Sequence, residues 1–225
     1  SNELQSQYVV NGNAVALGGN CFRLTTANFS QSGAVWSQNK LNLEDDFTIN
    51  ASIYLGNNDG GADGIAFVLQ PVCNGIGGFG GGIGYQGINP SLAIEFDTWY
   101  NGDQNDPTAD HIALQRNGSV MHDGGTNTLE GPYVQPNMEN NANHPIIVNW
   151  DAGSQTLTLN YDGNLIFTYV GDIVADALGG FEKVYWGFTA ATGSAFNEQR
   201  VCIGTTSYQE ETPYTVTDAS CPNLS

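Results

Sequence analysis

Residues 47–55, FTINASIYL, alternate apolar and polar side chains over the length of a typical strand. Because successive side chains of a strand point to opposite faces of its sheet, the alternation predicts a strand with Phe47, Ile49 and Ile53 turned toward a core. Thr48 would then face away from that core. A strand of this kind is typical of a sheet with one buried face.

Short apolar or alternating runs recur along the chain, separated by turn residues. These runs predict strands at 65–70, 92–97, 111–116, 146–150, 156–161, 165–170, 184–189 and 200–208. Only Ile173–Leu178 favours a helix. The pattern indicates an all-β fold, an antiparallel sandwich, and neither a repeat nor a linker divides it. We therefore expect one domain over residues 1–225, with a tail after about residue 209 that the pattern does not place.

The charge balance excludes two classes of partner. Five Lys and Arg residues stand against 23 Asp and Glu residues, which gives a net charge of −18 at pH 7. Such a field repels nucleic acid backbones and anionic membrane surfaces. No apolar run is long enough to span a bilayer, so we expect neither a nucleic acid partner nor membrane insertion.

The four cysteines, Cys21, Cys73, Cys202 and Cys221, lack the close spacing of a zinc site. They favour two disulfides and a secreted or cell-surface setting, with every pairing of the four left open. The chain starts at Ser1 without a leader sequence, which we interpret as a processed or excised segment.

An acidic stretch, EFDTWYNGDQNDPTADH at residues 95–111, contains one predicted strand end and leads into the next strand. Alternation places Glu95 and Asp97 together on the face opposite Ile94. Neighbouring carboxylates with no basic residue nearby repel each other and need a cation or a shared proton. His111 opens the next strand, and the intervening loop allows its imidazole to return to the carboxylates.

Two kinds of cation fit these side chains. Asp97, Asn101 and Asp106 offer the oxygens that Ca²⁺ prefers, from a loop long enough to wrap around the ion. Glu95, Asp97, Asp106 and His111 offer the mixed oxygen and nitrogen ligands of Mn²⁺ or another transition metal. The alternative is a solvated acidic turn, which is common in so acidic a chain.

The same residues resemble the metal loop of the L-type (legume-type) lectins. That family pattern is Glu-x-Asp-x-aromatic-x-Asn, with an Asp five residues on and a His five beyond. It matches without a gap at Glu95, Asp97, Trp99, Asn101, Asp106 and His111. The resemblance implies a concanavalin-like jelly roll of two antiparallel sheets, and we expect a bacterial member.

By this resemblance, two ions would occupy the loop. Asp97, Asn101, Asp106 and the main-chain oxygen of Trp99 would hold Ca²⁺. The transition metal would take Glu95 and His111, and would share both aspartates with the Ca²⁺.

Further matches imply a sugar site. Residues 61–67, GADGIAF, resemble the family's Ala-Asp-Gly segment, in which the Ala–Asp peptide is cis and the Asp accepts from sugar hydroxyls. Asp63 would take that role. Residues 80–85, GGGIGY, resemble the glycine loop whose amide meets the sugar, with Gly81 the best match and Gly82 the next.

The resemblance extends to residues 186–193, WGFTAATG, which resemble the strand before the last sugar-binding loop. The amides of Ser194 and Ala195 would complete the pocket, Asn101 would donate to a sugar hydroxyl, and Trp99 would stack on the pyranose. The loop from Ser194 to Arg200 has the short form typical of mannose and glucose binders. We therefore expect glycan partners of gluco or manno configuration.

Two other functions share this fold. A sandwich glycoside hydrolase would carry Glu-x-Asp-x-x-Glu, but the sixth position here is Tyr100, so no second acid stands at the required spacing. A structural spacer of an adhesin would lack the polar set around Asp63. We therefore predict a calcium-dependent lectin that is not an enzyme. His122 and His144 have no partner pattern, and we interpret both as ordinary surface histidines.

Overall fold

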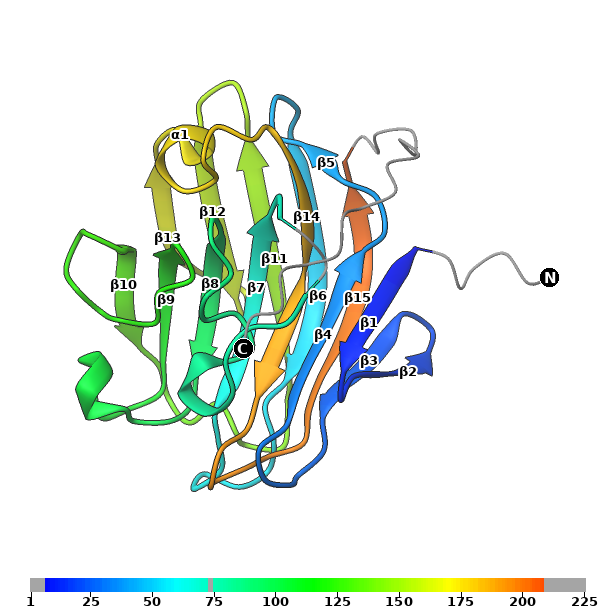
Figure 1. Ribbon diagram of the computed structural model, residues 1–225, viewed down its shortest axis with the longest axis vertical. Coiled ribbons are helices and arrows are strands. Elements are labelled where there is room, and N and C mark those ends of the chain that lie inside the picture. Colours follow the sequence, from blue (N-terminus) through cyan, green and yellow to red (C-terminus); the bar gives the residue numbers. More distant parts are fainter. Residues whose placement is uncertain (1–6, 73–74, 209–225) are drawn as a thin grey trace.

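The computed structural model describes residues 7–72 and 75–208, which form two antiparallel sheets lying face to face (Figure 1). The first sheet runs β1 (Tyr8–Gly12), β4 (Ser32–Ser37), β14 (Lys183–Ala191), β7 (Gly64–Gln70), β8 (Leu92–Asp97), β9 (His111–Arg116) and β10 (Thr128–Val134), with β5 (Leu41–Asn42) also paired to β14. The second sheet runs β13 (Asn164–Val170), β12 (Thr156–Tyr161), β11 (Asn143–Asp151), β6 (Phe47–Tyr54), β15 (Gln199–Ser207), β3 (Cys21–Thr25) and β2 (Val15–Gly18). The predicted all-β, two-sheet jelly-roll sandwich is therefore confirmed.

All nine predicted strands are present with small changes at their ends. β6, the strand predicted from alternation, has Phe47, Ile49 and Ile53 at no more than 1% exposure inside the core between the sheets. Burying one such side chain contributes about 1.5–3 kcal/mol. The predicted helix is α1 (Ile173–Asp176), which ends two residues earlier than expected.

Five short strands near the N-terminus and β10 are absent from the strand predictions. β10 contains Gly131 and Pro132 and pairs with β9 through two register shifts. Glycine and proline weaken the strand pattern, and a bulge breaks its period, so no alternation signals this strand.

A second, smaller core lies on the outer face of the first sheet. Trp36, Ala66 and Ala93 point outward from β4, β7 and β8, and Ile83 and Tyr85 cover them. The glycine-rich segment at residues 75–87 is therefore not a loose loop where it is described. This cover buries the face of β8 that alternation assigns to Glu95 and Asp97.

One of the expected disulfides joins Cys21 to Cys202, which are direct partners in the β3–β15 ladder. Cys73, Cys221 and the tail after about residue 209 lie outside the described residues. The helical segments of the described ranges, α1 and the 3₁₀ turns η1 (Gly80–Gly82) and η2 (Gly102–Gln104), are too short to cross a bilayer.

Candidate metal and carbohydrate site

The β8–β9 ladder positions the two ends of the acidic loop. Asp97 at the end of β8 is the direct partner of His111 at the start of β9, and Glu95 is opposite Ala113. Because Glu95 and Asp97 are two residues apart on one strand, both side chains lie on the same outward face. The loop between the strands returns Asp106 to that face, so residues far apart in the loop meet in one cluster.

The cluster contains three buried carboxylates. Glu95 is 0% exposed and Asp97 is 2% exposed, and Asp106 is also buried. Burial raises the pKa of Asp97 well above its usual range, and the negative charges of Glu95 and Asp106 raise it further. The Tyr85 hydroxyl donates to Glu95 Oε2 at 2.5 Å. Three carboxylates this close are stable only with protons or cations among them.

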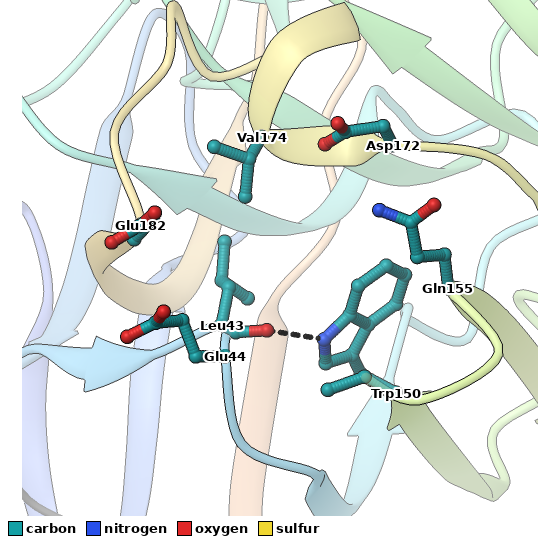
Figure 2. Close-up of a pocket in the computed structure, with 8 residues that line it drawn as sticks. Leu43, Glu44, Trp150, Gln155, Asp172, Val174 and Glu182 are labelled. Carbon is teal, nitrogen blue, oxygen red and sulfur yellow. Dashed lines mark hydrogen bonds between the residues drawn. The ribbon is translucent and has the colours of Figure 1, made fainter.

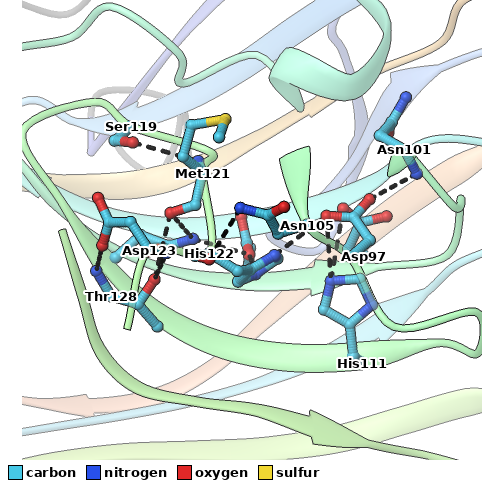
Figure 3. Close-up of polar contacts among 12 residues, drawn as sticks. Asp97, Asn101, Asn105, His111, Ser119, Met121, His122, Asp123 and Thr128 are labelled. Atoms are coloured by element: carbon cyan, nitrogen blue, oxygen red, sulfur yellow. Dashed lines mark hydrogen bonds and ion pairs between the residues drawn. The ribbon is translucent and has the colours of Figure 1, made fainter. Parts of the chain in front are cut away.

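His111 presents one free ring nitrogen to the carboxylates. Its Nδ1 lies 3.1 Å from the carbonyl oxygen of Ala109. Its Nε2 lies 3.8 Å from Asp97 Oδ2 and 4.0 Å from Asp106 Oδ1, and it has no hydrogen-bond partner among the described residues. Burial lowers the pKa of His111, which favours the neutral ring that can bind a metal. Figure 3 shows the ring directed at Asp97.

The structure corrects the prediction for His122, which is buried in the same cluster (Figure 3). Its Nε2 lies 2.6 Å from Glu95 Oε1 and its Nδ1 lies 3.0 Å from Asp106 Oδ1. Burial lowers the pKa of His122, but the hydrogen bonds to Asp106 and Glu95 outweigh it and raise the pKa to about 9. The sequence gives no signal for this contact because 27 residues separate His122 from Glu95.

His144 is also wrongly predicted as a surface residue. It is 3% exposed, its Nδ1 lies 2.8 Å from Asp162 Oδ2, and its ring stacks on Tyr161. These contacts lie on the second sheet, where β11 and β12 pair, so His144 supports the sandwich and not the cluster.

The loop after β8 is folded around the same carboxylates. The Trp99 amide donates to Asp97 Oδ1 at 2.8 Å, and the Asn101 amide donates to Asp106 Oδ2 at 2.6 Å. The Asn101 Oδ1 atom is buried and has no hydrogen-bond partner among the described residues. An added Cβ on Gly81 would lie 2.6 Å from that oxygen, so the glycine loop can approach Asn101 only as glycine.

These donors fit the implied ions. Three buried carboxylates and an unpartnered amide oxygen are the hard ligands that Ca²⁺ takes. The buried, unpartnered Nε2 of His111 is the nitrogen that a transition metal takes beside carboxylates. The side chains form two groups, and within each group the ligand atoms lie no more than 4.8 Å from one another. One group is Glu95, His111 and His122, and the other is Asp97, Asp106 and His111.

Asp63 lies beside the glycine loop and the loop after β14. The Ala62–Asp63 peptide bond is cis, as the resemblance implies. Asp63 is 3% exposed, and its Oδ2 has no hydrogen-bond partner among the described residues. Burial raises the pKa of Asp63 to about 7, against a lowering by the Gly193 amide. Cβ atoms added to Gly80 and Gly193 would lie 3.9 Å and 3.5 Å from Oδ2, so two glycines leave space around this oxygen.

Three loops therefore meet near Asp63. The Gly80 amide donates to Thr192 O at 3.3 Å, and the Gly193 amide donates to Ala195 O at 3.1 Å. Ser194 in this last loop is exposed. The Gly82 amide is already used, because it donates to Phe79 O at 3.0 Å at the start of η1. Gly81 is the glycine of this turn that lies against Asn101.

Two of the hollows on the surface of the described residues bear on the choice of site, one beside the acidic loop and one remote from it. Trp99 and Tyr100 line one of about 310 Å³, and Asp63 is not among its lining residues. The other, of about 270 Å³, is lined by Leu43, Trp150 and three carboxylates and shares no residue with the cluster (Figure 2). In it, Trp150 Nε1 donates to Leu43 O at 2.9 Å. We place the candidate site at the cluster and Asp63.

Residues 1–205 match the family model of the legume lectin beta-barrel domain. The chain belongs to the legume lectin family. Solved legume lectins share its fold: lectin I-B4 from Griffonia simplicifolia aligns with a TM-score of 0.74 at 20% identity, covering 94% of this chain and 96% of that one. Peanut lectin aligns at 0.73 with 22% identity, covering 95% and 96%.

The curated relatives of this legume lectin chain are much longer proteins. A serine-rich adhesin for platelets from Staphylococcus aureus is 27% identical over 83% of this chain, which spans 9% of the adhesin. The pesticidal crystal protein Cry22Aa of Bacillus thuringiensis is 38% identical over 39% of this chain, which spans 12% of that protein.

Proposed function

We propose that this legume lectin domain binds glycans in a calcium-dependent manner and does not turn them over. One observation carries the proposal: among the described residues, buried ligand atoms of the metal cluster that have no hydrogen-bond partner lie near Asp63, whose Oδ2 also has none. Asn101 links the two parts, since its backbone amide donates to Asp106 and its unpartnered Oδ1 lies beside Gly81, in the loop next to Asp63.

In this proposal Asp97, Asn101, Asp106 and the main-chain oxygen of Trp99 hold Ca²⁺. Glu95, Asp97, Asp106 and His111 hold Mn²⁺ or another transition metal. When bound, the ions neutralise the carboxylates and hold the loop in place before the sugar arrives. Preorganisation of this kind raises affinity, because the conformational entropy of the loop is lost when the ions bind and not when the sugar binds.

The sugar contacts come from the chain itself. Asp63 accepts from two hydroxyls through its carboxylate, and Asn101 donates from its amide nitrogen. Gly81, with Gly82 next to it, and the amides of Ser194 and Ala195 line the rest of the site, and Trp99 stacks on the pyranose. The space that Gly80 and Gly193 leave beside Asp63 Oδ2 supports this assignment.

The contacts and burial of the carboxylates favour binding without hydrolysis. Glycoside hydrolysis needs an acid and a nucleophile or base, about 5–5.5 Å apart for retention and farther for inversion. Glu95 is engaged by Tyr85 and His122 and is 0% exposed, so it cannot reach a substrate oxygen. Tyr100 stands where a sandwich hydrolase carries its second acid.

We further propose a secreted or cell-surface location, in which residues 1–225 act as one lectin domain of an adhesin. The cross-strand disulfide between Cys21 and Cys202 and the similarity to the serine-rich adhesin support this. The short Ser194–Arg200 loop favours gluco- or manno-configured glycans. The fold does not choose between sugars, since the related structures include one with methyl-α-D-galactose and one in a Man3GlcNAc-bound form.

A glycan array tests the proposal. Protein refolded with Ca²⁺ and Mn²⁺ is applied with and without a chelator, and an Asp63→Asn variant is applied in parallel. We expect binding that the chelator and the substitution both abolish. Binding by the loaded protein to no glycan at all would favour the spacer function instead.

A further inference from the structure

His122 is the histidine of the cluster that the 95–111 pattern does not contain. From its position we infer that His122 is a direct ligand of the transition-metal ion, together with Glu95 and His111. This inference rests on the proposed metal site and adds a second imidazole to it. It assigns a binding role to a loop, residues 117–127, that the pattern leaves without one.

The distances place the three ligand atoms around one point. One nitrogen from each histidine and one Glu95 oxygen lie within 4.8 Å of one another, and all three side chains are buried. The two rings meet edge to face with centroids 4.9 Å apart. First-row ions hold nitrogen and oxygen ligands at about 2.0–2.2 Å, so two ligand atoms on one ion lie roughly 3–4 Å apart. Small side-chain shifts reach that spacing.

In both rings Nδ1 is engaged outside the metal position and Nε2 is directed at the carboxylates. His111 Nε2 has no partner among the described residues, whereas His122 Nε2 lies 2.6 Å from Glu95 Oε1, so a bound ion would take the place of a proton in that contact. His111 Nδ1 is positioned to donate to Ala109 O at 3.1 Å, and His122 Nδ1 to Asp106 Oδ1 at 3.0 Å. A neutral ring that donates from Nδ1 keeps its lone pair on Nε2, so His122 binds an ion once its second proton has been released. Metal-binding histidines commonly use their other nitrogen in this way, with a carbonyl or a carboxylate as the acceptor. Both Nε2 atoms face the carboxylates.

The chain holds His122 in place through bonds of its own. The His122 amide donates to Gln104 O at 2.9 Å, which ties it to the acidic loop. Asp123 accepts from the amides of Asn127 and Thr128 at 2.6 Å and 3.1 Å and closes the loop on itself (Figure 3). The imidazole is therefore positioned by neighbouring residues, as expected of a preorganised ligand.

A second imidazole changes which ion the site prefers. Imidazole suits Zn²⁺, Co²⁺ and Ni²⁺, whereas carboxylate and water suit Mn²⁺. With His111 and His122 both bound, we expect this domain to prefer Zn²⁺ or Co²⁺ over Mn²⁺ by a wider margin than a site with one imidazole would.

Calorimetry on the whole chain tests the assignment. Protein stripped of metal by a chelator is first given Ca²⁺ again. It is then titrated separately with Co²⁺, Zn²⁺ and Mn²⁺. A His122→Gln variant keeps Glu95 and His111 but loses the second imidazole. We expect its affinity for Co²⁺ and for Zn²⁺ to fall by about 10-fold or more. His144→Gln is the matched control, since His144 is also buried beside a carboxylate but lies outside the cluster. We expect it to leave both affinities within about twofold.

A second measurement needs no variant. Proton spectra of the Co²⁺-loaded wild-type protein should show two exchangeable, hyperfine-shifted imidazole N–H signals. One signal, together with His122→Gln binding Co²⁺ as tightly as the wild type or more so, would overturn the inference and leave the proposed two-ion site standing. A wild-type protein that takes up no transition metal would overturn the two-ion site as well.

Discussion

Asp97 and His111 are direct partners in the β8–β9 ladder, so the sheet fixes both ends of the acidic loop before any ion is bound. The amides of Trp99 and Asn101 then fold the loop onto Asp97 and Asp106. The negative charge of the buried carboxylates is not balanced by the loop itself. The ions of the proposed function would supply the positive charge that balances it.

Removing the shared carboxylate should remove both ions. In an Asp97→Ala variant we expect metal content to fall to background for Ca²⁺ and for the transition metal, because Asp97 belongs to both ligand sets. Plasma mass spectrometry of dialysed protein measures this. Asp103→Ala is the control, since Asp103 is exposed in the same loop. An Asp97→Ala protein that keeps either ion would show that the ligand sets are assigned wrongly.

Asp63 should be needed for sugar and not for folding. An Asp63→Asn variant keeps the shape but replaces one acceptor oxygen with a donor nitrogen. Because a hydrogen bond to a charged group contributes about 1.5–3 kcal/mol, we expect a weak sugar affinity to fall below detection in calorimetry. Unfolding temperature and metal content should change little, and a variant that still binds sugar would contradict the role given to Asp63.

Glu139 should make stability depend on pH. Burial, together with the neighbouring Asp110 carboxyl, raises the pKa of Glu139 to about 9. The folded state therefore holds a proton that the unfolded state loses near pH 4.5. Between those values the folded protein binds more protons, so its stability falls as pH rises toward about 9.

A Glu139→Gln variant should lose that dependence. Urea unfolding at pH 5 and pH 9 should show a smaller loss of stability in the variant than in the wild type, by something on the order of a few kcal/mol. Glu44→Gln is the control, because Glu44 is exposed. Parallel curves for wild type and Glu139→Gln would mean that Glu139 is ionised in the folded protein.

Sugar preference should follow the short last loop. We expect methyl mannoside or glucoside to bind more tightly than methyl galactoside, because amides at Ser194 and Ala195 suit an equatorial O4. Monosaccharide affinities should be about millimolar, as for small polar ligands in open sites. Calorimetry with the three glycosides measures the order, and a galactoside that bound tightest would remove loop length as the determinant.

Much of the fold and part of the site could be predicted from sequence. The alternation at residues 47–55 gives β6 its buried face, and the pattern from Glu95 to His111 gathers one ladder and its loop. Both signals are local or periodic. The cover over β8 was not predictable from local pattern, because Ile83 and Tyr85 reach it through a glycine-rich segment without a period.

His122 escaped prediction for a related reason. Its partners are Glu95 and Asp106, and only the tertiary return of the 117–127 loop brings it to them. A histidine between Met121 and Asp123 carries no local sign of burial. A spacing rule built on the acidic loop alone therefore finds His111 and misses His122.

Calcium-dependent sugar binding is tested most directly by calorimetry with methyl mannoside on one preparation in three states: loaded with Ca²⁺ and Mn²⁺, stripped by chelation, and reloaded. We expect saturable binding in the loaded state, none detectable in the stripped state and full recovery on reloading. Equal affinity in the loaded and stripped states would contradict it.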